Sequence, residues 1–275
     1  MIRCKPLLGT FVEIMIEDDA QSSQALSEAF LAIEKVQSLM GFHHPDSELS
    51  QINARSYLEP VCIHPWTARV LAISKEIYLQ SQGVFNCGVG HRLVEAGLLP
   101  NHFSLGDHSF GGIEDLDFIE ENLVRSQLPL CLDLGGIAKG YAVDKAIEIL
   151  QAHKISVGSV NAGGDIRVFG DRAQDIQIRN PFNPHELIQI GSMQTGAIAT
   201  SSLYFAKRDA NSQSYLINPL NHEHIEFEES YSVIANECVY ADALTKVISI
   251  TKNIHHPCLK HFSAQAIRIP NTPTI

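Results

Sequence analysis

The sequence lacks the features of a membrane-spanning, zinc-ribbon or nucleic-acid-binding protein. No apolar run approaches the ~18 residues of a membrane span, and none of the six cysteines forms a Cys-x-x-Cys pair. Acidic residues outnumber basic ones by 31 to 20, and the formal net charge is -11. Bulk charge therefore gives no attraction for nucleic acid or an anionic membrane. A phosphate ligand would need local help from backbone amides or a bound cation.

The N-terminal residues 1–6 lack the apolar segment of a signal peptide. We therefore expect a cytoplasmic protein, unless a leader has been trimmed. The chain has 275 residues, of which 45% are hydrophobic and 19% charged, enough for one large domain or two moderate ones. Cys131 and Cys238 lie in apolar runs and are predicted to be buried thiols.

The apolar pattern predicts many short strands interleaved with a few longer helices. Helices are expected over 18–41 and 65–82, where apolar residues recur every three or four positions. A short helix capped by Asp46 or Ser47 is expected between them. Strands are expected over 7–16, 128–133, 176–179, 197–202 and 231–235, and a last helix from residue 241. This pattern favours an α+β fold in which helices cover mixed and antiparallel sheets.

Residues 128–150 form the clearest candidate for a ligand site. They are predicted to form a buried strand ending at Asp133, a turn opened by Gly135 and Gly136, and a helix with Lys139 in its first turn. The start of a helix presents free N–H groups and the positive end of its dipole to an anion. Two interpretations stay open: a phosphate or carboxylate site, or an ordinary strand-to-helix connection that uses glycine.

Several common motifs are absent. The phosphate-loop pattern fails because Tyr141 and Ala142 stand where Lys and Ser or Thr are needed, and the dinucleotide-binding fingerprint is broken at 135–137. No Gly-x-Ser-x-Gly elbow occurs. The histidine-rich segment 255–261 could bind a metal, but its spacing matches no known zinc pattern, and a solvated surface is the favoured interpretation.

Two other segments have both a structural and a functional interpretation. Gly88 and Gly90 would let a ligand approach the backbone closely, or they form a flexible turn. Asp242 is predicted near a helix start, where it acts as a cap or first-turn carboxylate. If it faces the glycine turns, its carboxylate would suit Mg²⁺ bridging to phosphates.

Taken in order, six stretches of the chain resemble the ApbE family, the FAD:protein FMN transferases. The most specific is 133–144, which is a near-complete match to the motif of that family. The other five are Leu8-Gly9-Thr10 and the segments 46–53, 161–165, 199–201 and 241–244. Any one of them is weak evidence, whereas six in the same order are strong evidence.

The resemblance implies a T-fold-like α+β molecule, a single ApbE-like domain over 1–275 whose two lobes form one ligand cleft. It implies that FAD is bound with Mg²⁺ at the pyrophosphate, and that the FMN half passes to a Thr or Ser hydroxyl of a target flavoprotein, releasing AMP. The cofactor-binding residues it implies are Leu8, His43, Gly88, Val89, Gly90, Asp133, Lys139 and Leu216. The implied metal-site residues are Gly136, Asp242, Thr245 and Lys246, and the implied catalytic residues are Tyr215 and Asp242.

The chain departs from the family pattern at positions that matter for chemistry. Lys246 stands where the metal motif carries Thr, and Thr245 is one residue early, which turns a helical side chain by about 100°. The Lys246 ammonium is therefore expected either to occupy the position of the metal ion or to repel the ion. Tyr215 replaces a histidine, and a phenol with a reference pKa of about 10 is a poor base at neutral pH. The flavin-stacking tyrosine of the family is replaced by His43, or by Phe42 if the loop is shifted by one residue, and either ring can stack.

Three functions remain open from the sequence. The first is Mg²⁺-dependent transfer of FMN from FAD to a target flavoprotein, based on the intact central motif. The second is a catalytically impaired relative that binds FAD or another nucleotide as a carrier or assembly factor, based on Tyr215, Asn218, Lys246 and the missing Thr-Gly after Pro219. The third is a cleft re-used for another small ligand.

Overall fold

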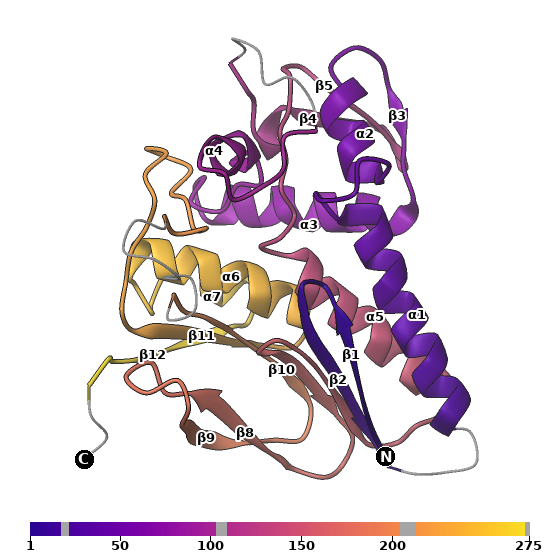
Figure 1. The fold of residues 1–275 in the computed structure, drawn as a ribbon, viewed down its shortest axis with the longest axis vertical. Helices are drawn as coiled ribbons and strands as arrows, with labels where there is room; N and C mark the ends of the chain where they lie inside the picture. The colour runs from indigo at the N-terminus through magenta and orange to yellow at the C-terminus, as the bar shows by residue number, and fades with distance from the viewer. Residues whose placement is uncertain (18–21, 103–108, 204–212, 273–275) are drawn as a thin grey trace.

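A seven-stranded antiparallel sheet forms the base of the molecule in the computed structural model, which describes residues 1–17, 22–102, 109–203 and 213–272 (Figure 1). Every pairing between its neighbouring strands is antiparallel. Its strands lie in the order β1 (Ile2–Leu7), β2 (Thr10–Ile16), β6 (Gly158–Ala162), β7 (Asp165–Phe169), β10 (Gly196–Ser201), β11 (Ser230–Ala235) and β12 (Gln265–Ile269).

The strand predicted over 7–16 is a hairpin of two strands rather than one. Leu8 and Gly9 form its two-residue turn and both have positive φ, at 56° and 71°, which is the backbone twist that tight antiparallel turns favour. Leucine adopts positive φ at a steric cost, so its propensity does not predict the turn. The Leu8 N–H donates to Gln37 Oε1 at 2.6 Å, a contact that helps to hold this conformation.

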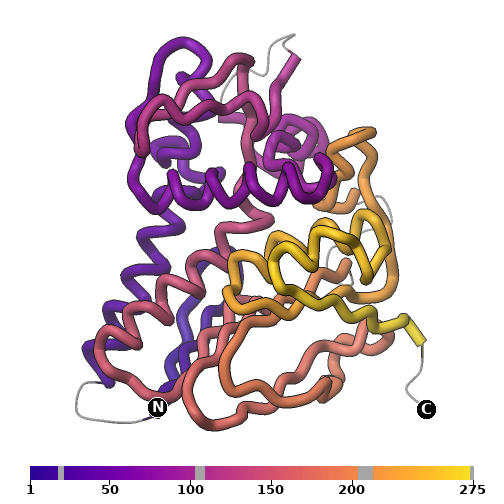
Figure 2. The backbone as a smooth tube through the Cα atoms, turned by 180° about the vertical axis from the view of Figure 1, so that it is seen from behind, coloured from indigo at the N-terminus to yellow at the C-terminus, as the bar shows by residue number. Residues whose placement is uncertain are grey.

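Three long helices lie on one face of the sheet. Helices α5 (Ala138–Ala152) and α6 (Cys238–Thr251) pack on its central strands, and α1 (Ser22–Met40) runs beside α5 (Figures 1 and 2). Residues 18–21 of the predicted first helix lie outside the described residues. On the opposite face a two-stranded ribbon, β8 (Gln174–Arg179) and β9 (Leu187–Met193), packs on β7 and β10 through a small apolar cluster around Val168, Ile176 and Ile198.

A second group of elements lies beyond the helices, away from the large sheet (Figure 1). It contains a three-stranded sheet in the order β3-β5-β4. Asp46 and Ser47 were the two predicted caps of the short helix α2 (Glu48–Arg55), and Ser47 is the one that caps it. Its side chain accepts a hydrogen bond from the Ser50 N–H. The elements are α2 (Glu48–Arg55), β3 (Val61–Cys62), α3 (Pro65–Gln80), α4 (Gly90–Glu95), the 3-10 turn η1 (Ile113–Asp115), β4 (Leu116–Glu120) and β5 (Leu123–Ser126). The short helix α7 (Cys258–His261) contacts both α3 and the edge strand β12 of the large sheet.

Two predicted helix bounds are wrong. Helix α3 ends at Gln80 rather than 82, because Gln82 and Gly83 take positive φ. Helix α6 begins at Cys238, three residues before the predicted start at 241, and the short α7 follows it.

The strand predicted over 128–133 is wrong, although Leu130, Cys131 and Leu132 are buried. It forms one isolated bridge, between Leu130 and Gly111. The Asn53 side chain instead takes the place of a neighbouring strand, because its amide donates to the Leu132 carbonyl at 2.9 Å and accepts the Leu132 N–H at 2.7 Å. The Asp133 N–H donates to the Cys87 carbonyl at 2.8 Å. Apolar sequence alone does not distinguish this arrangement from a strand.

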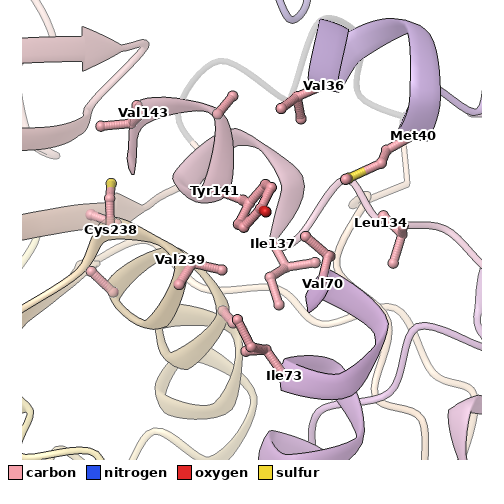
Figure 3. Packing of buried hydrophobic residues seen from close by; sticks show 14 of the residues in the cluster. Val36, Met40, Val70, Ile73, Leu134, Ile137, Tyr141, Val143, Cys238 and Val239 are labelled. Atoms are coloured by element: carbon pink, nitrogen blue, oxygen red, sulfur yellow. The ribbon is translucent and has the colours of Figure 1, made fainter. Parts of the chain in front are cut away.

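One continuous apolar core joins the two groups of elements. Leu134 and Ile137, on either side of the glycine pair 135–136, are fully buried. Figure 3 shows them among side chains of α1, α3 and α6, such as Met40, Val70 and Val239. This packing fixes the position of the glycine turn.

The α+β prediction is confirmed, and so is the prediction of buried thiols at Cys131 and Cys238. Among the helices of the described ranges, none has the length and apolar character to cross a membrane.

Candidate functional site

A cavity of about 670 Å³ lies between the two groups of elements. This volume is in the range of small-molecule and cofactor sites. Its walls come from the end of α1 and the loop after it, the loop 84–89, the turn 135–136, the first turn of α5, the end of β10, the segment 215–219 and one side of α6. The cavity therefore brings together segments from almost the whole length of the chain.

The close approach of α5 to α6 positions the polar floor of this cavity. A Cβ at Gly140 would lie 2.7 Å from the Cys238 carbonyl carbon and 2.8 Å from Asp242 Cβ, closer than real Cβ atoms come. Glycine at 140 therefore lets the two helices touch. At that contact the Gly140 N–H donates to Asp242 Oδ2 at 3.0 Å.

Two lysines and two buried carboxylates, which we call the charged quartet, meet at this helix contact. Lys139 Nζ lies 2.6 Å from Asp165 Oδ2 and 3.5 Å from Asp242 Oδ2. Lys246 Nζ forms an ion pair with Asp242 Oδ1 and donates to the Asp242 backbone carbonyl at 3.0 Å. The two carboxylates are almost fully buried, whereas both lysines line the cavity. Asp165 also lines the cavity, so the quartet presents both ammonium groups and one carboxylate to it, with Asp242 beneath them.

The pKa shifts within the quartet follow from burial and pairing. Burial acts to raise the pKa of Asp242, but the Lys139 and Lys246 ammoniums and the Gly140 N–H hold it below its usual value. Burial and the neighbouring Asp242 carboxylate raise the pKa of Asp165. Burial acts to lower the pKa of Lys139, but Asp165 and Asp242 raise it above its usual value. Lys139 and Asp242 are therefore both charged at neutral pH.

Asp242 is not a cap of its own helix, contrary to the sequence interpretation. It lies in the second turn of α6, and its carboxylate reaches across to α5. The first turn of α6 is capped instead by Asp144 of α5, which accepts the N–H groups of Cys238 at 2.9 Å and Val239 at 2.8 Å. Arg167 donates to the same Asp144 carboxylate at 2.6 Å.

Thr245 points into the protein rather than into the cavity. It is fully buried, donates to the Asp242 carbonyl at 2.7 Å, and accepts from Ser201 Oγ at 2.7 Å. Lys246, one residue on, faces the cavity. This is the outcome expected from the rotation of a helix by about 100° per residue.

The glycine turn and Asp133 form the adjoining wall. Asp133 Oδ1 accepts the Gly135 N–H at 3.1 Å, and burial raises the Asp133 pKa. A Cβ at Gly136 would meet only the Lys246 stem, at 3.5 Å or more. An alanine at 136 would therefore just reach van der Waals contact with the Lys246 side chain.

Most of the cofactor-binding, metal-site and catalytic residues implied by the family resemblance line the cavity. Those that line it are Leu8, His43, Val89, Asp133, Gly136, Lys139, Tyr215, Leu216 and Lys246. Four others are outside the lining: Gly88, Gly90, Asp242 and Thr245. Their predicted roles in binding FAD, binding metal or catalysis stay predictions.

The glycines at 88 and 90 make room for the protein itself. A Cβ at Gly88 would lie 2.6 Å from Gly112 Cα, and one at Gly90 would lie 3.1 Å from the Cys131 carbonyl carbon. The close approach expected of a ligand is thus made here by the chain's own backbone. Val89 between them lines the cavity.

The residues present do not fit the predicted magnesium site. Both carboxylate oxygens of Asp242 and its backbone carbonyl accept from Lys246, Lys139, Gly140 or Thr245. In the described ranges, no three His, Cys, Asp or Glu side chains gather closely enough to hold a metal ion. An ammonium thus lies where a divalent cation would contact Asp242.

Three residues of this region were missed as site residues. Asp165 lies in a motif noted in the sequence, and the glycines before it mark a hairpin turn, but nothing local shows that it pairs with Lys139. Gly140 and Asp144 lie four residues apart on α5 and contact α6. Only their spacing on one helical face is visible in sequence.

Comparisons with known proteins show the family to which this chain is similar. The model of the ApbE family matches residues 8–256. A FAD:protein FMN transferase of Vibrio cholerae is 28% identical over 263 residues, covering 87% of this chain and 78% of that protein. Another, from Treponema pallidum, is 23% identical over 284 residues, covering 88% and 76%.

Solved structures show the same fold. The flavin transferase ApbE from Vibrio cholerae has a TM-score of 0.83 and 25% identity, covering 99% of this chain and 94% of that chain. The ApbE protein from Thermotoga maritima also has a TM-score of 0.83, at 22% identity, covering 98% and 93%. The family model spans most of the chain, and both solved structures share its fold at a TM-score of 0.83. This chain belongs to the ApbE family.

Proposed function

We propose that this protein binds FAD in the cavity and transfers its FMN half to a Thr or Ser hydroxyl of a target flavoprotein, releasing AMP. The observation that carries the proposal is the pair of ammonium groups, Lys139 and Lys246, facing a cavity of cofactor size. Relatives named FAD:protein FMN transferase support the same activity.

The proposed chemistry is an in-line displacement at phosphorus. The acceptor hydroxyl oxygen forms a bond to the phosphorus on the FMN side of the diphosphate, and the bond from that phosphorus to the bridging oxygen breaks. AMP leaves with the bridging oxygen, and the hydroxyl proton passes to solvent. Such a reaction depends mainly on positioning and on neutralising the phosphate oxygens. The Lys139 and Lys246 ammoniums supply positive charge where these oxygens would lie.

The remaining lining residues suit the rest of the ligand. Leu8 and Leu216 offer apolar contact, and His43 offers a ring for stacking on the flavin. Tyr215 is half-exposed at the cavity, and its hydroxyl donates to the Ser202 carbonyl at 3.0 Å. A phenol that donates in this way suits orientation of the acceptor better than removal of its proton.

We leave magnesium out of the proposed chemistry. The requirement predicted from the family resemblance stays a prediction, and the engaged oxygens of Asp242 do not support it. Asp242 instead holds both lysines in place.

A second candidate is a relative that binds FAD without transferring FMN. The observation that favours it is the ion pair between Lys246 and Asp242, which closes the predicted metal site. Both candidates place FAD in the same cavity, so one experiment distinguishes them.

The experiment incubates the protein with FAD and a flavin-acceptor domain and measures the mass of the acceptor. The proposal expects a gain of one FMN, lost when the acceptor Thr is replaced by Ala. Saturable FAD binding with no mass gain would favour the carrier. No FAD binding would contradict both.

We also infer that residues 1–275 form one domain. The support is the continuous core that contains Val12 of β2, Val70 of α3 and Val247 of α6. Separate domains would each have a core of their own. Denaturant unfolding followed by tryptophan fluorescence at Trp66 and by circular dichroism is expected to give coincident transitions. Two separated transitions would contradict a single unit.

A further inference from the structure

The charged quartet contains an ammonium where a divalent cation would bind. Lys246 lies one helical turn after Asp242, and its Nζ contacts both the Asp242 carboxylate and the Asp242 backbone carbonyl, at 3.0 Å for the latter. A carboxylate oxygen and a backbone carbonyl converging on one point are oxygen donors of the kind that divalent cations take. Here that point is filled by a nitrogen of the chain itself.

The lysine is held by its ion pair with Asp242 and is largely covered by the protein, since only 16% of its side chain is exposed. A bound cation would have to displace this side chain. It would then compete with Lys139 and the Gly140 N–H for the remaining carboxylate oxygen.

The charge balance of the quartet is complete without a metal. Asp165, which also lines the cavity, pairs with Lys139, and the buried Asp242 pairs with Lys139 and Lys246. A ligand diphosphate is therefore the group that brings uncompensated charge. Both ammoniums line the cavity and have donors to spare, since each has three N–H bonds.

We propose that Lys246 takes the place of the divalent cation, so that the protein binds the diphosphate of a dinucleotide through Lys139 and Lys246 without any metal on Asp242. The proposal rests on the proposed function, because FAD is the dinucleotide it concerns. Lys246 then supplies a tethered positive charge in place of a dissociable cation. Binding of FAD becomes independent of the free magnesium concentration.

The test is an FAD titration of the purified wild-type protein, once in EDTA and once in excess Mg²⁺, read by flavin fluorescence. The proposal expects the two Kd values to agree within twofold. FAD binding only in Mg²⁺, or at least tenfold tighter in Mg²⁺, would overturn it and leave the proposed function standing. No binding in either buffer would overturn the proposed function and this inference together.

A pair of variants tests the lysine itself. Lys246→Met keeps the stem and removes the charge, and its Kd for FAD in EDTA is expected to rise about tenfold, the loss of one charge-assisted contact. Lys260→Met, on the exposed short helix α7, is the matched control and is expected to bind like the wild type. An unchanged Kd for Lys246→Met would overturn the proposal. The wild-type titrations need no variant to fold.

Metal uptake gives a readout that is independent of affinity. With Mn²⁺ as the probe, the electron paramagnetic resonance signal of the free ion is expected to be no smaller with the wild-type protein and FAD than with FAD alone. Uptake of one Mn²⁺ per protein chain would overturn the proposal.

Discussion

Replacing Gly140 by alanine tests whether the contact between α5 and α6 positions the charged quartet. Helix propensity alone favours alanine over glycine inside a helix by about 1 kcal/mol. The structure predicts the opposite sign, because the new Cβ would lie 2.7 Å from the Cys238 carbonyl carbon and 2.8 Å from Asp242 Cβ. Both are atoms anchored to the α6 backbone and cannot rotate away.

The expected loss of stability follows from two effects. Overpacking costs about 1–3 kcal/mol. Separating the helices also weakens the hydrogen bond from the Gly140 N–H to the Asp242 carboxylate, and bonds to charged groups contribute about 1.5–3 kcal/mol. With the propensity gain subtracted, Gly140→Ala should lower the free energy of unfolding by about 2–5 kcal/mol.

Urea denaturation followed by circular dichroism measures this difference. Gly136→Ala is the matched control, since its Cβ would meet only the flexible Lys246 stem at 3.5 Å or more, and its stability should change by less than about 1 kcal/mol. If Gly140→Ala is as stable as the wild type, or more stable, the described contact between the helices is wrong.

Two further predictions concern the groups around the cavity. Asn53→Ala leaves the buried N–H and carbonyl of Leu132 without their partner and should cost about 2–5 kcal/mol in urea denaturation, whereas the exposed Gln51→Ala on the same helix should cost less than about 0.5 kcal/mol; equal effects would refute the role of Asn53. The pKa of Asp242 is lowered, so its ionised form stabilises the fold above the unfolded-state pKa of about 3.9, and this contribution is lost as the pH falls through the folded-state pKa. The stability difference between wild type and Asp242→Asn should therefore be largest near pH 7 and should shrink steadily as the pH falls below about 3.9. A difference that does not depend on pH would contradict the ion pairs.

The sequence predicts those helices and caps of this fold that depend on residues close together in the chain. The amphipathic pattern of α1 and α3 and the cap at Ser47 were predicted because each depends on residues within a few positions. The turn at Leu8 and the segment near Leu132 were not, because their conformations depend on Gln37 and Asn53, which lie 29 and 79 residues away.

In the candidate site, too, the residues within a sequence motif were predicted, whereas the contacts between distant residues were not. The family motif selected Asp133, Lys139 and Lys246, and all three line the cavity. The pairing of Lys139 with Asp165 and the capping of α6 by Asp144 join different elements of the fold. Such contacts are visible only when the helices are placed against the sheet.

A crystal structure of the protein grown with FAD and MgCl₂ would show directly which cation contacts the diphosphate. We predict FAD in the cavity, with diphosphate oxygens within hydrogen-bond distance of the Lys139 and Lys246 Nζ atoms and with Lys246 still on Asp242. A Mg²⁺ ion on Asp242 with Lys246 turned away, or FAD bound outside this cavity, would contradict this prediction.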